Sequence, residues 1–346
     1  MKKLVLLAAT AVTLPTTAMA ELTLDTYGSL RIQAESVSVD KVATAGDDKS
    51  YSGFKDAYSR FGVTASYPLS NGTTLGAKLE IPFNTAQMKA GDPSYFEASY
   101  KDNNAPRVAK ITASGDWGSV AVGKQWLAYY NNIGYPVDYF SSFYSGFATH
   151  ATFRRDAVTY TTPNMSGFSA TVSAVDMVDG DGDYLDSSQY AASYSADGFS
   201  VALAYQDDYI PYSGAEENNI LGASASYTTG PWRFAGKTET AENESGDKAT
   251  IYNLYGSYTL GNYTFKAHYA EGDDKNTPEA AFFQGTSVHL GVDYQYNKDL
   301  MVFVEYFTEE KAYAIYTEDT DTFSSLGDYG TKTNGQAIAI GARYDF

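Results

Sequence analysis

Few residues of this 346-residue chain are spaced as a reactive site would require. Its three histidines are His150, His268 and His289, and no G-x-S-x-G, H-E-x-x-H or phosphate-loop motif is present. His268 and His289 lie on polar positions of two candidate neighbouring strands, but no third metal ligand is evident beside them. The sequence therefore predicts neither catalysis, nor a metal site, nor a cofactor.

The stretch DMVDGDGDYLD (176–186) resembles part of a calcium-binding loop, because Asp179, Asp181 and Asp183 alternate with glycines. The complete loop requires a bidentate glutamate at its twelfth position and a helix on each side. The flanking sequence alternates as strands do. An acidic, solvated loop is the favoured interpretation of this segment.

The chain begins like an exported protein. Lys2 and Lys3 precede a short apolar run, and Ala18-Met19-Ala20 is a small-x-small cleavage signal. We expect residues 1–20 to be a signal peptide and residues 21–346 to form one domain. Removing the two lysines makes the net charge more negative than −18, and such an acidic chain is not expected to bind nucleic acid.

The composition points to a β protein that is stabilised without disulfides. The sequence has no cysteine, and no run of eighteen apolar residues follows residue 20. It is rich in aromatic residues, with 31 tyrosines and 18 phenylalanines. Apolar residues recur at every second position in segment after segment, which is typical of strands with one apolar face. Sixteen strands are predicted, at 22–35, 56–68, 73–83, 105–114, 118–128, 153–162, 168–177, 188–196, 199–209, 219–229, 232–243, 249–260, 263–273, 285–296, 300–311 and 335–346.

The apolar faces carry their aromatic residues mostly at the strand ends, as in Phe199, Tyr227 and Trp232. Rings at both ends of a strand, with smaller apolar residues between them, match the two interfacial girdles of a membrane barrel. In lipid a sheet must close, so the last strand, which ends at Phe346, is expected to pair with the first. A soluble two-sheet protein is the alternative.

Several segments resemble the trimeric general porins of Gram-negative outer membranes. These are TYGSLR (26–31), YSRFGVTASYPLSNGTTLGAKLE (58–80), GDWGSVAVGKQW (115–126), RRDAVTYTTPNMSGFSATVSA (154–174) and GARYDF (341–346). The resemblance implies an all-β, sixteen-stranded antiparallel transmembrane β-barrel whose third long loop folds into the lumen. It also implies a homotrimer in the cell outer membrane, surrounded by lipid and lipopolysaccharide, with Phe346 as an assembly signal for the barrel assembly machinery.

The resemblance further implies a constriction where the third loop faces a ladder of basic residues. Along a strand, every second residue points to the same face. Arg31 belongs to the polar set of alternate positions in its strand and is expected to point inward, while the set to which Arg107 belongs is ambiguous. Asp138 is the only acid of the loop 129–152. The predicted constriction residues are Arg31, Arg60, Lys78, Glu80, Arg107, Asp138 and Arg155.

The same loop is unusually aromatic, and two interpretations are open. The rings pack the loop onto the wall, or they line a path for sugars, which stack on aromatic faces. The residues concerned are Trp126, Tyr129, Tyr130, Tyr135, Tyr139 and Phe140. The leading hypothesis is a channel for passive diffusion of small hydrophilic solutes and ions. The alternatives are an oligosaccharide-selective, chitoporin-like channel, an outer-membrane barrel enzyme and a structural or adhesive barrel.

Overall fold

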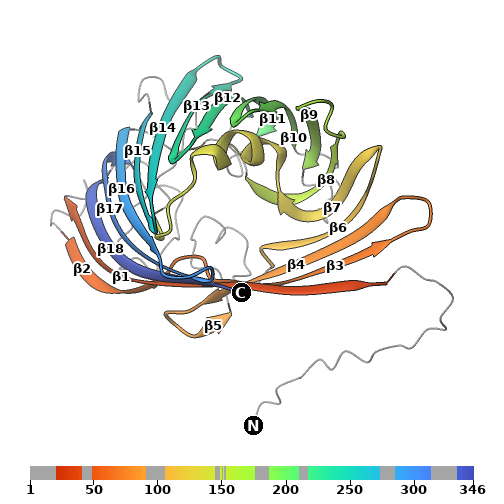
Figure 1. The fold of residues 1–346 in the computed structure, drawn as a ribbon. Helices are drawn as coiled ribbons and strands as arrows, with labels where there is room; N and C mark the ends of the chain where they lie inside the picture. Colours follow the sequence, from red (N-terminus) through yellow and green to blue (C-terminus); the bar gives the residue numbers. More distant parts are fainter. Residues whose placement is uncertain are drawn as a thin grey trace, which may run out of the picture.

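The computed structural model describes residues 21–40, 49–90, 106–144, 149, 151, 153–175, 187–209, 217–272, 285–312 and 333–346. The predicted signal peptide and the calcium-like segment 176–186 lie outside these residues. The described residues form one large β-sheet that closes on itself (Figure 1).

Every strand of the sheet pairs antiparallel with its neighbours, and β1 pairs with β18 to close the ring. β5 pairs only with β4, whereas β2 and β3 both pair with β1 and form one interrupted strand. The wall therefore has sixteen strands, which confirms the predicted barrel. Its elements are β1 (Thr23–Asp40), β2 (Lys49–Asp56), β3 (Arg60–Pro68), β4 (Thr74–Asn84), β5 (Lys89–Ala90), β6 (Val108–Gly115), β7 (Gly118–Trp126), β8 (Arg154–Thr161), β9 (Phe168–Val175), β10 (Ser187–Ala196), β11 (Phe199–Tyr209), β12 (Asn218–Thr229), β13 (Trp232–Asn243), β14 (Lys248–Leu260), β15 (Tyr263–Gly272), β16 (Gly285–Gln295), β17 (Leu300–Ala312) and β18 (Thr333–Asp345).

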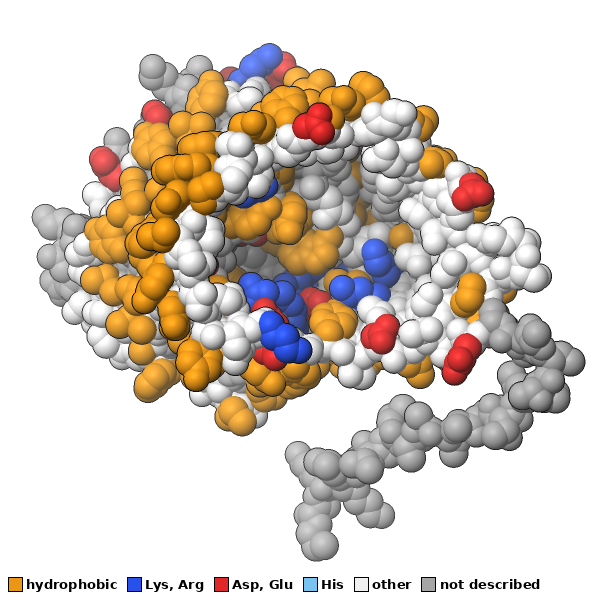
Figure 2. Space-filling view, viewed as in Figure 1, with side chains coloured by type: hydrophobic (Ala, Val, Ile, Leu, Met, Phe, Trp, Pro, Cys, Tyr) orange, Lys and Arg blue, Asp and Glu red, His pale blue; other side chains and the backbone are white. Residues whose placement is uncertain are grey.

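The alternation of the sequence sorts side chains between the two faces of the wall. On β14, Leu254 is 63% exposed on the outside, whereas its neighbour Asn253 is buried inside. Figure 2 shows apolar side chains over much of the outer surface and charged side chains within the opening. This is the pattern of a barrel whose outer face meets lipid and whose inner face meets water.

Barrel closure extends to the last residue of the chain. The Gly28 amide donates to the Phe346 carbonyl at 2.9 Å, and the Phe346 amide donates to the Gly28 carbonyl at 3.1 Å. The Phe346 ring covers Gly28 and contacts the rings of Phe61 and Tyr344, at centroid distances of 6.0 and 5.7 Å. Pairing with the first strand therefore holds the C-terminus in place, as predicted.

The predicted boundaries near the N-terminus were wrong in two respects. β1 continues to Asp40 and β2 begins at Lys49, so the predicted connection 37–55 was too long. The predicted strand 56–68 is interrupted at Ala57–Ser59, where Tyr58 has a φ of 67°. Phe54 before the break and Phe61 after it are both exposed on the outside, so the interruption reverses the parity.

Two helical turns follow β7: η2 (Tyr130–Gly134) and η3 (Tyr135–Val137). They belong to residues 127–144, called the inner segment below. No helix in the described part of the chain has the length and apolar character needed to cross a membrane.

Candidate functional site

The inner segment runs along the inside of the wall. Its helical turns contact β10 to β14, and Figure 1 shows them within the ring, opposite β3, β4 and β6. The Tyr129 amide donates to Oε1 of Gln189 on β10 at 2.8 Å, and the Ser224 hydroxyl of β12 donates to the Asn132 carbonyl at 2.6 Å. Side chains of the wall therefore satisfy backbone groups that lie outside regular secondary structure.

The second half of the inner segment is attached to β17 and β1. The amides of Ser141 and Ser142 donate to the two carboxylate oxygens of Glu305, at 2.8 and 2.9 Å. The amide of Phe143 donates to Oε1 of Gln33 at 2.8 Å. Three consecutive amides thus find acceptors on inward-facing residues of β17 and β1, the two strands that flank β18.

Glu305 is the centre of a buried charged cluster beneath this attachment. Its carboxylate lies 3.0 Å from Nζ of Lys266 and 3.1 Å from Nε2 of His289. Lys266 also lies 2.9 Å from Asp293 and donates to the Tyr139 carbonyl at 3.1 Å. The sequence analysis did not select Lys266, Asp293 or Glu305, although the first two lie on polar parities of their strands.

The aromatic side chains of the inner segment mostly pack against the wall. Tyr129 is fully buried beside Ile133 and Ile220, and Phe140 stacks on His289 with a centroid distance of 3.6 Å. Trp126 stacks on Tyr130 at 4.6 Å.

Two further rings of the predicted path, Tyr135 and Tyr139, are less buried. Tyr135 is 52% exposed, and Tyr139 lies 5.3 Å from the Tyr255 ring. Because Tyr129, Tyr130 and Phe140 are buried, the geometry favours the packing interpretation over a continuous ring-lined path for sugars.

The predicted basic residues converge on one side of the channel. Glu80 accepts hydrogen bonds from the Tyr27 hydroxyl at 2.7 Å and from Nε of Arg107 at 3.1 Å, and lies 3.8 Å from Nε of Arg60. Nζ of Lys78 lies 4.7 Å from the centroid of the Tyr27 ring. The structure thus brings Arg60, Lys78, Glu80 and Arg107 together and settles the ambiguous position of Arg107.

Arg31 and Arg155 lie on strands that flank this group. Arg31 is buried on the inner face of β1, where it pairs in register with Arg343 and donates from Nε to the Ser29 hydroxyl at 2.8 Å. Arg155 pairs in register with the buried Gln125. Figure 2 shows lysine and arginine side chains gathered on one side of the opening.

One inward-facing lysine was missed by the sequence analysis. Lys110 on β6 pairs in register with Lys78, while its neighbour Ile111 is 64% exposed on the outside. The signal was available, because Lys110 shares its parity with Thr112 and Ser114. We use the name basic wall for the inward-facing Arg31, Arg60, Lys78, Arg107, Lys110 and Arg155.

His268 and His289 are direct register partners on β15 and β16. His268 lies 3.1 Å from Oδ1 of Asn253, and His289 contacts Glu305. Within the part of the chain that the structure describes, no three histidine, cysteine or carboxylate side chains are grouped as metal ligands.

Asp138, the acid of the inner segment, accepts a hydrogen bond from the Tyr130 hydroxyl at 2.7 Å. Burial raises the pKa of its carboxyl to about 6, although the Tyr130 hydrogen bond and the charges of Arg31 and Lys237 favour the ionised form. Asp138 is therefore neutral below about pH 6 and negatively charged above it.

Acidification from pH 7.5 to 5 should consequently favour anions over cations in the channel. A unit charge about 7 Å from a passing ion contributes roughly 0.6 kcal/mol in water, with opposite sign for anions and cations. Loss of the Asp138 charge should therefore change the permeability ratio about sevenfold. Reversal potentials in a salt gradient at stepped pH measure this change. An Asp138→Asn variant should not show the change of reversal potential near pH 6. If this variant showed the same change, a group other than Asp138 would be responsible for it.

The closed barrel, its apolar exterior and its charged interior define an outer-membrane channel. A family model described as Gram-negative porin matches residues 5–311, and the chain belongs to this family. It is an outer-membrane porin that allows passive diffusion of small hydrophilic solutes, and the resemblance found in the sequence is confirmed.

Comparison with solved structures finds the same fold at low sequence identity. The anion-selective porin from Comamonas acidovorans superposes with a TM-score of 0.66 and 18% identity, covering 94% of this chain and 100% of that one. The loop L8 deletion mutant of OmpT from Vibrio cholerae gives 0.65 and 19%, covering 94% and 99%. OmpF of Salmonella typhi in complex with daunomycin gives 0.66 and 18%, covering 93% and 97%.

The comparison with curated proteins gives no match. The chitoporin-like alternative finds no support in the family match or in these structures, in agreement with the burial of the aromatic side chains.

Proposed function

We propose that the porin is a non-enzymatic channel whose narrowest passage lies between the inner segment and the basic wall. The supporting observation is that the inner segment is attached to the wall from β10 round to β1 and, through a 3.0 Å hydrogen bond from the Tyr58 hydroxyl to the Phe143 carbonyl, to the break between β2 and β3. Its hydrogen bonds reach β10, β12, β17 and β1, while Figure 1 places β3, β4 and β6 across the opening. Solutes would pass Arg60, Lys78 and Arg155 on one side and Asp138 on the other.

The assembly proposed for the protein follows from its family. Residues 1–20 would be removed on export, and residues 21–346 would form the barrel. One Vibrio cholerae OmpT structure of this fold is described as a trimer form, which supports a homotrimer for this chain. Lipid and lipopolysaccharide would surround the trimer, and the barrel assembly machinery would recognise Phe346.

Removing two charges from the basic wall tests the position of the constriction. Arg60→Ala combined with Arg155→Ala should increase the conductance, because two long side chains are lost from the passage. Each removed charge should lower the ratio of anion to cation permeability by about sevenfold if ions pass within about 7 Å, because roughly 0.6 kcal/mol is lost by the anion and gained by the cation. Conductance and reversal potential of single channels in a planar bilayer measure both effects.

Lys248→Ala is a suitable control for this double variant. Lys248 forms an exposed ion pair with Glu242 at 2.9 Å, at the start of β14 rather than on the basic wall. If the double variant conducts like the unchanged protein and reverses at the same potential, Arg60 and Arg155 do not line the constriction.

A further inference from the structure

We propose that the channel contains a site for small multivalent oxyanions, built around Lys78 and Lys110 on the basic wall. This inference rests on the proposed function and adds the class of solute that the channel retains. Inorganic phosphate is the simplest member of that class.

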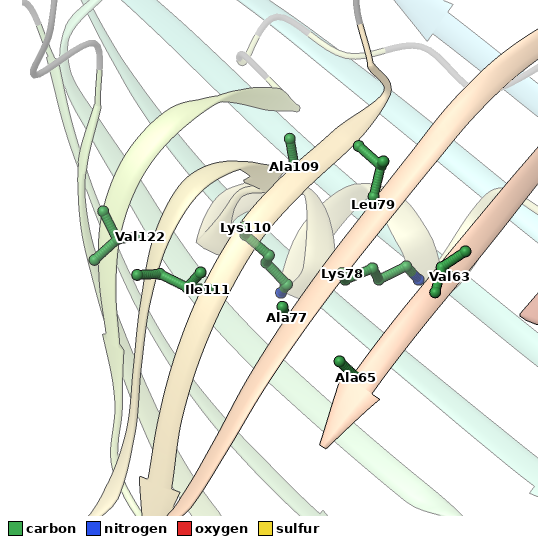
Figure 3. Close-up of a pocket in the computed structure, with 9 residues that line it drawn as sticks. All are labelled: Val63, Ala65, Ala77, Lys78, Leu79, Ala109, Lys110, Ile111 and Val122. Carbon is green, nitrogen blue, oxygen red and sulfur yellow. The ribbon is translucent and has the colours of Figure 1, made fainter. Parts of the chain in front are cut away.

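The two lysines are adjacent on the inner face of the wall. Lys78 on β4 and Lys110 on β6 are direct register partners, and Figure 3 shows them side by side on neighbouring strands. The residues that follow them, Leu79 and Ile111, are exposed on the outer face, at 42% and 64%. Alternation along each strand therefore directs both lysines toward the lumen.

Two like charges placed directly opposite each other on neighbouring strands are destabilising unless a countercharge is present. Among the described residues, neither Lys78 nor Lys110 forms an ion pair with an acid. The nearby carboxylate, Glu80, is occupied by Tyr27, Arg107 and Arg60.

The other inward-facing lysines differ from this pair. Lys55 lies 3.6 Å from Glu35, Lys237 pairs with Glu239, and Lys266 pairs with Asp293 and Glu305. Within the described part of the chain, Lys78 and Lys110 thus differ from the other inward-facing lysines in having no carboxylate partner, and we infer that an anion from solution supplies their countercharge.

The surroundings suit an oxyanion better than a halide. Thr64 on β3 is the register partner of Lys78, so a hydroxyl lies in the same row as the two ammonium groups. The Tyr27 ring supports the Lys78 ammonium from one side. Lysine is a common phosphate ligand, and a dianion interacts with both charges at once, whereas chloride has a single charge.

The site lies on the part of the wall that faces the inner segment across the opening. Passing solutes would meet it rather than a surface covered by protein. A weak site in this position would raise the local concentration of oxyanions without closing the channel.

The experiment is single-channel recording in potassium chloride with added inorganic phosphate. The unchanged protein should show a chloride current that falls with phosphate concentration. In a Lys78→Gln, Lys110→Gln double variant the half-blocking concentration should rise at least about threefold, as expected when two partly solvated charge contacts are lost. Lys110→Glu should have a similar effect, because a carboxylate then supplies the countercharge of Lys78.

Lys248→Gln removes one positive charge outside the lumen, and phosphate should block this variant as it blocks the unchanged protein. The proposed site would be overturned if phosphate blocked the double variant at the same concentration as the unchanged protein. It would also be overturned if Lys248→Gln weakened the block as much as the double variant does. A conducting protein insensitive to phosphate would also overturn it while leaving the porin function intact. Absence of any conductance would instead contradict the proposed function.

Discussion

Replacing Glu305 with alanine is expected to release the inner segment and to destabilise the barrel. The change removes the carboxylate that accepts hydrogen bonds from the amides of Ser141 and Ser142. It also removes one of the carboxylate partners of Lys266, and the side chains of Lys266 and Glu305 are both almost completely buried. Loss of one partner of a buried ion pair costs about 3–5 kcal/mol. The free energy of unfolding in detergent should fall by about that amount.

The same variant should also conduct less steadily. With Ser141 and Ser142 no longer held on β17, the inner segment would move within the lumen, and single-channel records should show rapid fluctuations. Glu305→Gln separates the two roles of the residue, because the amide retains an oxygen acceptor but not the charge. Glu242→Ala is the matched control, since that acid forms an exposed ion pair, which contributes at most about 1 kcal/mol. A stable, quiet Glu305→Ala channel would show that Glu305 does not hold the inner segment.

Replacing Gly28 with valine should prevent normal closure of the barrel. A Cβ atom at Gly28 would overlap the Phe346 ring, and the two residues also exchange both of their backbone hydrogen bonds. Overpacking of this kind typically costs about 1–3 kcal/mol. The measurement is the yield of folded, heat-resistant protein together with its unfolding free energy.

Gly53→Val is the control, because a Cβ atom at Gly53 meets nothing within 4 Å. Deletion of Phe346 should impair assembly at least as much as Gly28→Val, since it removes both the ring and the proposed recognition signal. A Gly28→Val protein that folds with normal yield and stability would show that the position of the Phe346 ring does not matter for closure.

Most of the fold could be predicted from the alternation of apolar and polar residues along the strands. The strands 199–209 and 232–243 were predicted with the limits that β11 and β13 have in the structure. Parity failed at Tyr58, because an interruption in one strand reverses the inward and outward sets beyond it. Phe54 has an even number and Phe61 an odd one, although both face outward. This change between even and odd positions is the only sign of the interruption that these two residues give in the sequence.

The site was predictable only in part, for a physical reason. Arg31, Arg60 and Lys78 all lie on the polar positions of alternating strands, so their inward direction is predictable from the sequence, because that property is local to a strand. It did not show that Glu305 would meet Ser141, since that contact depends on how a connection lies inside a closed barrel. Alternation places Lys266 and Asp293 on the inner face of their strands, but the meeting of both with Glu305 is a tertiary feature that no single strand reveals.

Single-channel recording of the purified protein in a planar bilayer tests the central claim most directly. A water-filled channel with a fixed inner segment should give large steps of current that are proportional to voltage, and a homotrimer should give them in groups of three. Folded protein that inserts into the bilayer and passes no current would contradict the account of an open diffusion channel.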